Sequence, residues 1–270
     1  MNFSLYKQMM KVNIKGVLNY AIGAAFYIMI VVWIYPSMEK TAQPLNDMLK
    51  VLPAGMTKAF NLQNGFGSFE SFMSGEFYGV LFTLIVSIYC VTVPIQLMAK
   101  LVDQGSMAYL LSTPTTRGKV AFTQASVFIT GLFLISAITT IFGIIGVRIF
   151  IDDTNSFHAE RFIQLNVAAF ALFFALGGIS FLVSSLSNDE KKGLGISGMI
   201  IFGFFSLDII RKISDKVDWL KNFTIFTLYQ PAEVVIGKGD LTQDWVILFA
   251  IGLVAFIVSI LAFRKRDLPL

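Results

Sequence analysis

Few side chains in this sequence are of the kinds that carry out chemistry. There is one histidine, His158, and one cysteine, Cys90. His158 has Asp152, Asp153 and Glu160 nearby, and a histidine beside carboxylates can transfer protons or bind a metal ion. A zinc site needs about four Cys, His or acidic ligands, so we expect His158 to be a solvated loop residue. Cys90 lies within a long apolar run, where we expect it to pack as a small hydrophobic side chain.

Sequence motifs that bind nucleotides or cleave bonds do not occur. A phosphate-binding loop requires Gly-x-x-x-x-Gly-Lys-[Ser/Thr], and Gly237-Lys238 has no glycine at the required spacing before it. The Gly-x-Ser-x-Gly motif of serine hydrolases and the His-Glu-x-x-His motif of zinc proteases are also missing. We therefore expect neither a catalytic site nor a cofactor or metal site in this chain.

The composition indicates another kind of protein. Of the 270 residues, 56% are hydrophobic and only 14% are charged, against about 45–50% and roughly 25% in soluble domains. The 27 phenylalanines exclude a disordered chain, and a single cysteine excludes a disulfide-stapled secreted domain. The class that remains is an integral membrane protein.

Six apolar stretches are long enough to cross a bilayer as helices, which takes about 20 residues. The first stretch is too long for a signal peptide and has no cleavage site, so we expect it to be a retained helix. The sequence thus predicts an all-α membrane protein in which residues 1–270 form one transmembrane domain. The expected spans are residues 16–35, 77–99, 120–147, 162–187, 193–210 and 245–263.

Asp208, in the fifth span, is the one charged residue within these stretches. Ionisable residues inside a membrane are functional candidates by default. Arg211 and Lys212 follow Asp208 at three and four residues, so all three lie on one side of a helix. We expect an interfacial ion pair at the outer end of this span. An ion-coupled carrier or a charged pore would need acids nearer the middle of a span.

The distribution of Lys and Arg between the loops predicts the orientation. If both termini are cytoplasmic, the inner segments contain eleven basic residues and four acids, and the longer outer segments contain ten basic residues and thirteen acids. We therefore place both termini in the cytoplasm. The net charge of +4 reflects this orientation. It does not indicate nucleic-acid binding, since no face gathers basic residues with aromatics between them.

Two segments on the cytoplasmic side have apolar residues but are too short to span. In residues 1–15, lysines four residues apart share one side of a helix, which predicts an amphipathic helix lying in the inner interface; a frayed basic tail is the alternative. In residues 100–119, a short apolar stripe predicts one or two helical turns that need something to pack on, either a cytoplasmic partner or the protein's own spans. The residues that carry the first prediction are Phe3, Tyr6, Lys7, Lys11 and Lys15.

The two long outer loops also contain patterns. In residues 36–76, apolar residues at helical spacing before Pro53 predict a surface helix, and residues 61–75, rich in Gly, Ser and Phe, are expected to be loop. Residues 211–244 contain an aromatic stripe suited to the outer headgroup level, formed by Trp219, Phe223 and Phe226. Glycines that allow close helix packing, within the chain or against a second subunit, are Gly177 and Gly178 in the fourth span and Gly193, Gly195, Gly198 and Gly203 in the fifth.

Three stretches together resemble the permease subunits of bacterial ABC-2 type transporters. Residues 105–119 (GSMAYLLSTPTTRGK) are similar to the family's loop after its second span, G-x-x-x-Y-L-L-S-x-P-x-x-R-x-x. Residues 228–233 (LYQPAE) and 263–270 (FRKRDLPL) are similar to its last outer loop and its C-terminal end. The family often has two acids before the loop glycine, whereas this chain has Asp103-Gln104.

The resemblance implies a membrane subunit of an exporter in the bacterial cytoplasmic membrane. A separate ATPase subunit would bind ATP and Mg²⁺, a second permease subunit would complete a homo- or heterodimer, and residues 1–15 would match the family's interfacial helix. The apolar, aromatic-rich spans favour an amphipathic peptide, a lipid-like molecule or a drug as cargo. Residues 105–116 would be a coupling helix that contacts the ATPase, through Gly105, Met107, Tyr109, Leu110, Leu111, Ser112, Thr113 and Pro114.

Other functions stay open at this point. An ATPase-independent channel or secondary carrier would transport without a partner. A membrane scaffold or sensor would bind a cytoplasmic protein through residues 105–116 without moving a solute. An intramembrane enzyme is the least favoured, because the sequence offers no paired catalytic groups.

Overall fold

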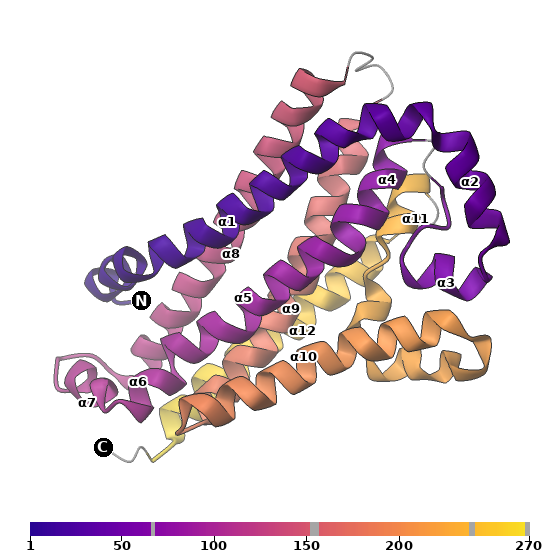
Figure 1. Cartoon of the computed structure of the whole chain (residues 1–270). Coiled ribbons are helices and arrows are strands. Elements are labelled where there is room, and N and C mark those ends of the chain that lie inside the picture. The colour runs from indigo at the N-terminus through magenta and orange to yellow at the C-terminus, as the bar shows by residue number, and fades with distance from the viewer. Residues whose placement is uncertain (66–67, 152–156, 238–240, 268–270) are drawn as a thin grey trace.

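The computed structural model describes residues 1–65, 68–151, 157–237 and 241–267. Every regular element in these ranges is a helix (Figure 1). Six helical runs are long and apolar enough to cross a membrane, which confirms the all-α membrane protein with six spans. These runs are Phe3–Lys40, Phe69–Asp103, Arg117–Phe150, Ala159–Leu186, Glu190–Ile213 and Thr242–Lys265.

Five of the six runs are single helices, and the second is divided. The single helices are α1 (Phe3–Lys40), α8 (Arg117–Phe150), α9 (Ala159–Leu186), α10 (Glu190–Ile213) and α12 (Thr242–Lys265). The second run consists of α4 (Phe69–Gly75), the π-helix η1 (Glu76–Leu81), α5 (Phe82–Leu97) and α6 (Ala99–Asp103). Short helices connect the runs: α2 (Ala42–Val51), α3 (Ala54–Ala59), α7 (Ser106–Leu111), the 3₁₀ helices η3 (Asp215–Phe223) and η4 (Ile225–Leu228), and α11 (Pro231–Ile236).

Helix α9 lies at the centre of the bundle. Two-thirds of the residues in its most apolar stretch are buried, compared with about a fifth of those in α10. Helix α12 packs along α9, and α1 packs along α8 (Figure 1). The short connection between α9 and α10 would suit a packed antiparallel pair, yet the two helices separate beyond it, and α10 packs on α3, α5 and η3. One side of α10 is therefore uncovered within the described chain.

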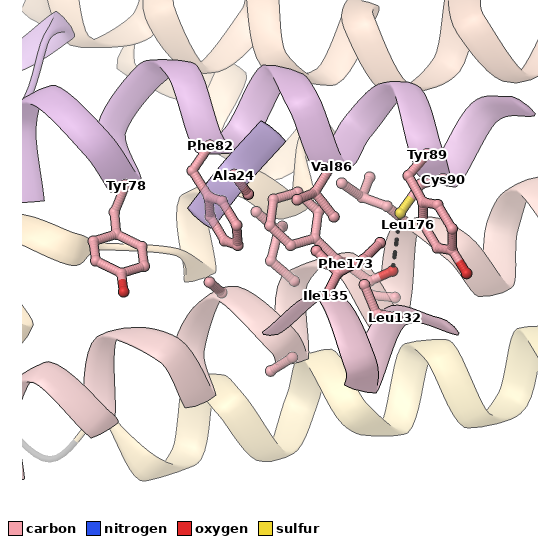
Figure 2. Close-up of a cluster of buried hydrophobic side chains, with 14 of the residues drawn as sticks. Ala24, Tyr78, Phe82, Val86, Tyr89, Cys90, Leu132, Ile135, Phe173 and Leu176 are labelled. Carbon is pink, nitrogen blue, oxygen red and sulfur yellow. Dashed lines mark hydrogen bonds between the residues drawn. The ribbon is translucent and has the colours of Figure 1, made fainter. Parts of the chain in front are cut away.

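Aromatic and aliphatic side chains fill the space between α5, α8 and α9 (Figure 2). Phe82 packs edge-on against Phe173, with ring centroids 5.7 Å apart. Tyr89 stacks on Phe128 at 5.1 Å, and its hydroxyl donates to the Phe128 carbonyl oxygen at 2.9 Å. Cys90 is fully buried, and its Sγ lies 3.5 Å from the Phe173 carbonyl oxygen. The prediction that Cys90 packs as a small core residue is confirmed.

The start of α1 and the end of α12 lie at one end of the bundle, next to α6 and α7 (Figure 1). This arrangement agrees with an even number of spans and with both termini on the same side of the membrane. The loop between the second and third spans lies at that same end. The loops containing α2, α3 and α11 lie at the opposite end.

The expectation of a loop over residues 61–75 was wrong for Phe69–Gly75. These residues form α4 and are all buried. The Ser68 side chain caps the helix by accepting a hydrogen bond from the Ser71 amide at 3.2 Å. The ring of Tyr35 in α1 lies 5.3 Å from that of Phe69. Capping and burial outweigh the Gly- and Ser-rich composition, because tertiary contacts override a weak local propensity.

Residues 1–15 do not form a separate helix before the first span. Helix α1 is continuous from Phe3 to Lys40 and begins at Asn2, whose side chain accepts a hydrogen bond from the Leu5 amide at 3.1 Å. Gly16 lies within the helix without breaking it, as single glycines are tolerated there at a cost of about 1 kcal/mol. The first turns run in a different direction from the rest of α1 (Figure 1).

Candidate functional site

The cytoplasmic-side loop is positioned by a sharp bend in the second span. Met98, between α5 and α6, has φ −127° and ψ −70°, which is outside the helical region. Pro94 precedes it by one turn and lacks the amide hydrogen that a helix needs. A bend frees backbone groups, and inside a membrane these need partners from the protein.

Ser184 of α9 supplies the partner of the Ala99 amide and a second donor to the Pro94 carbonyl oxygen, which also accepts the Met98 amide at 3.2 Å. Its hydroxyl donates to the Pro94 carbonyl oxygen at 2.7 Å and accepts from the Ala99 amide at 3.1 Å. Ser184 is 1% exposed, so water cannot take over these roles. One side chain on the central helix therefore holds the two halves of the bent span together.

Helix α6 follows this bend, and a glycine, Gly105, stands directly before α7. Gly105 has φ +70°, a left-handed conformation in which side chains other than glycine are strained. Met107 then points into the protein and is fully buried, whereas Tyr109 is 81% exposed. The prediction of a short helix at this place is confirmed. One face of this helix is buried in the protein and the other is exposed.

The eight predicted contact residues divide between those two faces. Met107 is enclosed and cannot touch a partner, so its predicted role is corrected to that of an anchor. Leu110 and Leu111 are partly buried and pack on the core. The exposed members are Gly105, Tyr109, Ser112, Thr113 and Pro114.

Two side-chain hydroxyl groups cap the C-terminal end of α7. Ser112 Oγ donates to the Tyr109 carbonyl oxygen at 2.8 Å, and Thr113 Oγ1 donates to that of Leu110 at 2.6 Å. These bonds satisfy carbonyl groups that the last turn of a helix leaves free. Pro114 then prevents continuation of the helix. The exposed end of α7 is therefore a defined turn.

Charged groups tie α6 to the connection between α9 and α10. Lys100 Nζ lies 3.2 Å from Glu190 Oε1, and the Glu190 amide donates to Asp103 Oδ2 at 3.1 Å. Arg266, just after α12, donates to the carbonyl oxygens of Ser185 and Ser187 at 2.6 and 3.1 Å. Helix α7 therefore follows and contacts a helix, α6, that is itself tied to the start of α10.

The predicted interfacial residues lie along the first turns of α1. Lys7, Lys11 and Lys15 are all exposed, and Phe3 is 69% exposed. Tyr6 turns toward α8, where its hydroxyl lies 2.9 Å from Thr130 Oγ1. The exposed lysines lie four residues apart, as an amphipathic helix requires, although they belong to a longer helix.

The comparison with known families agrees with this architecture. The model of the ABC-2 family transporter proteins matches residues 5–268, which is nearly the whole chain. The chain belongs to the ABC-2 family. A comparison with curated proteins found no match. This ABC-2 protein is accordingly a multi-pass membrane subunit of an ABC transporter, and members of its family are transport components that normally work with a separate ATPase subunit.

At the opposite end of the ABC-2 protein, the predicted Asp208 ion pair is present. Arg211 Nε lies 2.9 Å from Asp208 Oδ1, and Lys212 Nζ lies 2.8 Å from Oδ2. Asp208 is 3% exposed. One carboxylate is thus shared by two cations at the end of α10.

A second buried acid was not recognised from the sequence. Glu70 of α4 is 2% exposed. Its Oε1 accepts the backbone amide of His158 at 2.6 Å and lies 3.3 Å from the His158 Nδ1. The His158 side chain is 57% exposed, as expected for a loop residue. Asp152 and Asp153, expected near it, lie outside the described residues.

The residues 228–233 have a structural role at the π-helix. Tyr229 is buried, and its hydroxyl donates to the Tyr78 carbonyl oxygen at 3.0 Å. Thr83 Oγ1 donates to the same oxygen at 2.7 Å. Burial raises the pKa of the Tyr229 phenol well above its ordinary value, which keeps the donor protonated. Of the C-terminal stretch that carried the resemblance, residues 268–270 lie outside the described chain.

We predict that Tyr229→Phe lowers the free energy of unfolding by about 1 kcal/mol, the usual net value of one hydrogen bond. The loss stays small because Thr83 continues to satisfy the Tyr78 carbonyl oxygen. Thermal unfolding of the purified protein in detergent measures the change. The double variant Tyr229→Phe/Thr83→Val leaves that carbonyl oxygen without a side-chain donor and should lose more than the two single losses added together. Simple additivity would contradict the shared role.

Proposed function

We propose that this ABC-2 protein is the permease subunit of an exporter and that its ATPase partner docks on the exposed end of α7. The observation that carries the proposal is the exposed ring of Tyr109 on a short helix whose other face is anchored by Met107. Exposed aromatic side chains on a rigid base are typical of binding hot spots. Family membership supplies the kind of partner.

The contacts around α7 suggest how a movement of the ATPase would reach the spans. A push on Tyr109 passes through Met107 to the bundle and through α6 to Ser184 on α9. The Lys100–Glu190 ion pair passes the same displacement to the start of α10. Helix α10 has the least coverage of the six spans, so it is the span that can move with the smallest loss of packing.

The transport path would lie between this subunit and a second permease subunit, identical or related. The uncovered side of α10 offers large apolar residues such as Ile196, Met199 and Phe202. An apolar wall of this kind favours an amphipathic peptide, a lipid-like molecule or a drug over an inorganic ion. ATP and Mg²⁺ would be bound by the ATPase subunit, and this chain would need no cofactor. The positive-inside distribution supports a bacterial cytoplasmic membrane location with both termini inside.

The test of the proposal is co-purification of the ATPase with Tyr109 variants of the full chain. We expect Tyr109→Asp to reduce the co-purified ATPase at least tenfold, since loss of a hot-spot contact costs about 2 kcal/mol or more. Tyr109→Phe is the matched control, because it keeps the ring and should retain the partner. A change at Leu110 is less suitable, since Leu110 packs on the core and its loss would disturb folding.

A second sample replaces residues 105–116 by a Gly/Ser linker. The ATPase should disappear from this sample while the protein still inserts in the membrane. Transport by a reconstituted protein without any ATPase would instead favour a channel or carrier. Normal ATPase binding by both Tyr109→Asp and the linker variant would refute docking on α7.

A further inference from the structure

A pocket with a volume of about 490 Å³ lies at the end of the bundle that carries α6 and α7. Its walls come from the first turn of α8 and the last turn of α12, with Met1 at its edge. Figure 1 shows the starts of α1 and α8 and the end of α12 together at this end. Three cations line the pocket, and none of the described residues in its wall is an acid. The cations are Arg117, Lys119 and Arg264.

Tertiary contacts bring these cations together from two distant parts of the chain. Arg117 Nη1 donates to the carbonyl oxygen of Arg266, just after α12. A methyl group placed at Gly118 would lie 3.8 Å from Arg264 Cδ, so the Arg264 side chain passes close to the first turn of α8. Lys119 follows Gly118 directly in that turn. The pocket therefore belongs to the folded protein and not to one stretch of sequence.

The acids at this end of the bundle do not neutralise the pocket. Asp103 and Asp189 each accept a backbone amide at the start of α10, and Glu190 pairs with Lys100. Asp267 is exposed just after α12. Within the described residues, no carboxylate lies within 4 Å of any of the three lining cations. Even with Asp267 counted, three cations face one acid.

The ordinary preference of cations for this side of the membrane does not account for the pocket. That preference explains why basic residues are frequent in these segments, but it does not require them to meet in one place. Arg117 and Lys119 also lie in the first turn of α8, whose backbone dipole is positive at this end. Basic side chains are unfavourable there and favourable at the other end of a helix. An anion in the pocket would offset both the repulsion between the cations and this unfavourable position.

The pocket lies at the boundary of the membrane's hydrocarbon core. The apolar run of the third span begins at Val120, directly after Lys119, and that of the sixth span ends at Phe263, directly before Arg264. Phe122, which also lines the pocket, is 47% exposed. Two spans thus independently place the pocket at the level of the lipid headgroups. In the orientation proposed above, this is the inner leaflet.

We propose that this pocket binds a phosphate group between Lys119 and Arg264, with Arg117 as the third cation. A guanidinium group presents paired donors that match phosphate oxygens, and a lysine adds a point charge. Basic pockets between spans on the cytoplasmic side suit anionic lipid headgroups, and the volume lies within the range of ligand sites. The two sources of such a group are an anionic lipid and free phosphate. The site does not depend on the docking of an ATPase to α7.

The test measures binding to the purified full chain in a neutral detergent, without an ATPase. Short-chain phosphatidylglycerol is titrated in one arm and inorganic phosphate in the other, with short-chain phosphatidylcholine as the zwitterionic comparison. We expect Lys119→Met and Arg264→Met each to weaken binding of the anion about fivefold, the usual contribution of one cation near a membrane surface. Both side chains are exposed and have no hydrogen bond or ion pair with the described residues, so both variants should fold.

The matched control is Lys191→Met. Lys191 is an exposed cation at the start of α10, at the same end of the bundle, and does not line the pocket. Its replacement should leave binding unchanged. Binding of phosphatidylglycerol alone would identify a headgroup site, and binding of inorganic phosphate would show that the phosphate group itself is recognised.

Four results would overturn the proposal. They are equal binding of phosphatidylcholine, no binding of either anion, unchanged binding in both Lys119→Met and Arg264→Met, and an equal loss in Lys191→Met, which would indicate only diffuse attraction. Co-purification of the ATPase with the same variants gives a second measurement. If the variants lose the ATPase and the wild type binds no anion, the cations serve the surface of the partner instead.

Discussion

Gly252→Ala is expected to lower the free energy of unfolding by about 1–3 kcal/mol, the cost of overpacking a close contact. A methyl group at Gly252 would lie 2.8 Å from the Phe174 carbonyl oxygen and 2.5 Å from the Phe174 ring. The ring can move, but the backbone oxygen of α9 cannot. Because α12 and α9 form the most extensive helix pair of the bundle, separation at this point would loosen the whole core.

The reciprocal position leads to the same expectation. A methyl group at Gly178 would lie 2.8 Å from the Gly252 carbonyl oxygen and 3.2 Å from the Ala255 Cβ. The two glycines thus allow direct contact between the backbones of α9 and α12, as small residues do in membrane helix pairs. Gly178→Ala should therefore destabilise the protein to a similar extent.

Gly203→Ala is the matched control. A methyl group there would have no neighbouring atom within 4 Å in the described chain, and alanine favours a helix over glycine by up to about 1 kcal/mol. Thermal unfolding in detergent should therefore place Gly252→Ala below the wild type and Gly203→Ala at or above it. A Gly252→Ala protein as stable as the control would show that the α9–α12 contact is looser than described.

The glycines show how far the sequence could predict packing. Six of them were recognised in the fourth and fifth spans as sites of close approach, within the chain or with a second subunit. The structure separates them: Gly177, Gly178 and Gly193 are packed inside the chain, whereas Gly195, Gly198 and Gly203 face open space. Glycine spacing along one helix does not tell which helix lies opposite. Gly252, in the most tightly packed pair, was therefore not distinguished.

Hydropathy predicted the six spans because each must exceed the same bilayer thickness, and the six helical runs confirm it. It failed at the start of the second span, where Phe69–Gly75 is helical although rich in small and polar residues. Those residues are buried by contacts with Tyr35, which lies more than 30 positions earlier in the sequence. The acid Glu70 was missed for the same reason, since it lies in the part expected to be loop.

The short helix that we propose as the docking site was predicted in position but not in detail, and its contact with an ATPase stays a prediction. The motif at residues 105–119 and the short apolar stripe both indicated a helix at α7, and the left-handed Gly105 explains why a glycine precedes it. The sequence could not tell which apolar residue faces inward, because a six-residue helix has fewer than two full turns. Met107 was therefore included among the contact residues although it is enclosed. The role of Ser184 was not predicted, since it depends on a bend 90 residues earlier in the chain.

Ser184→Ala is expected to separate ATPase binding from coupling, on the proposal that α7 receives the ATPase. The change leaves the Ala99 amide without its partner, whereas the Pro94 carbonyl oxygen keeps the Met98 amide; an unsatisfied buried group costs about 1–3 kcal/mol. The surface of α7 is unchanged, so the ATPase should still co-purify. Stimulation of ATP hydrolysis by the permease should fall about tenfold, which corresponds to a coupling free energy within the usual 1–3 kcal/mol.

The matched control for this last prediction is Ser187→Ala, near the same end of α9. Among the described residues, the Ser187 hydroxyl donates to the Val183 carbonyl oxygen of α9, at 2.8 Å, and does not join α9 to another helix, so its removal should leave both binding and stimulation intact. Loss of ATPase binding in Ser184→Ala would mean that the bend shapes the docking surface itself, whereas full stimulation would mean that α6 carries no force to α9. These outcomes can be told apart because the hydroxyl of Ser184 on α9 bonds to backbone groups of both α5 and α6. Ser184 lies near the end of α9, where Arg266 donates to the Ser185 carbonyl oxygen. On the proposed coupling, a rigid joint at this point would allow a small displacement at Tyr109 to move whole helices instead of only bending the loop.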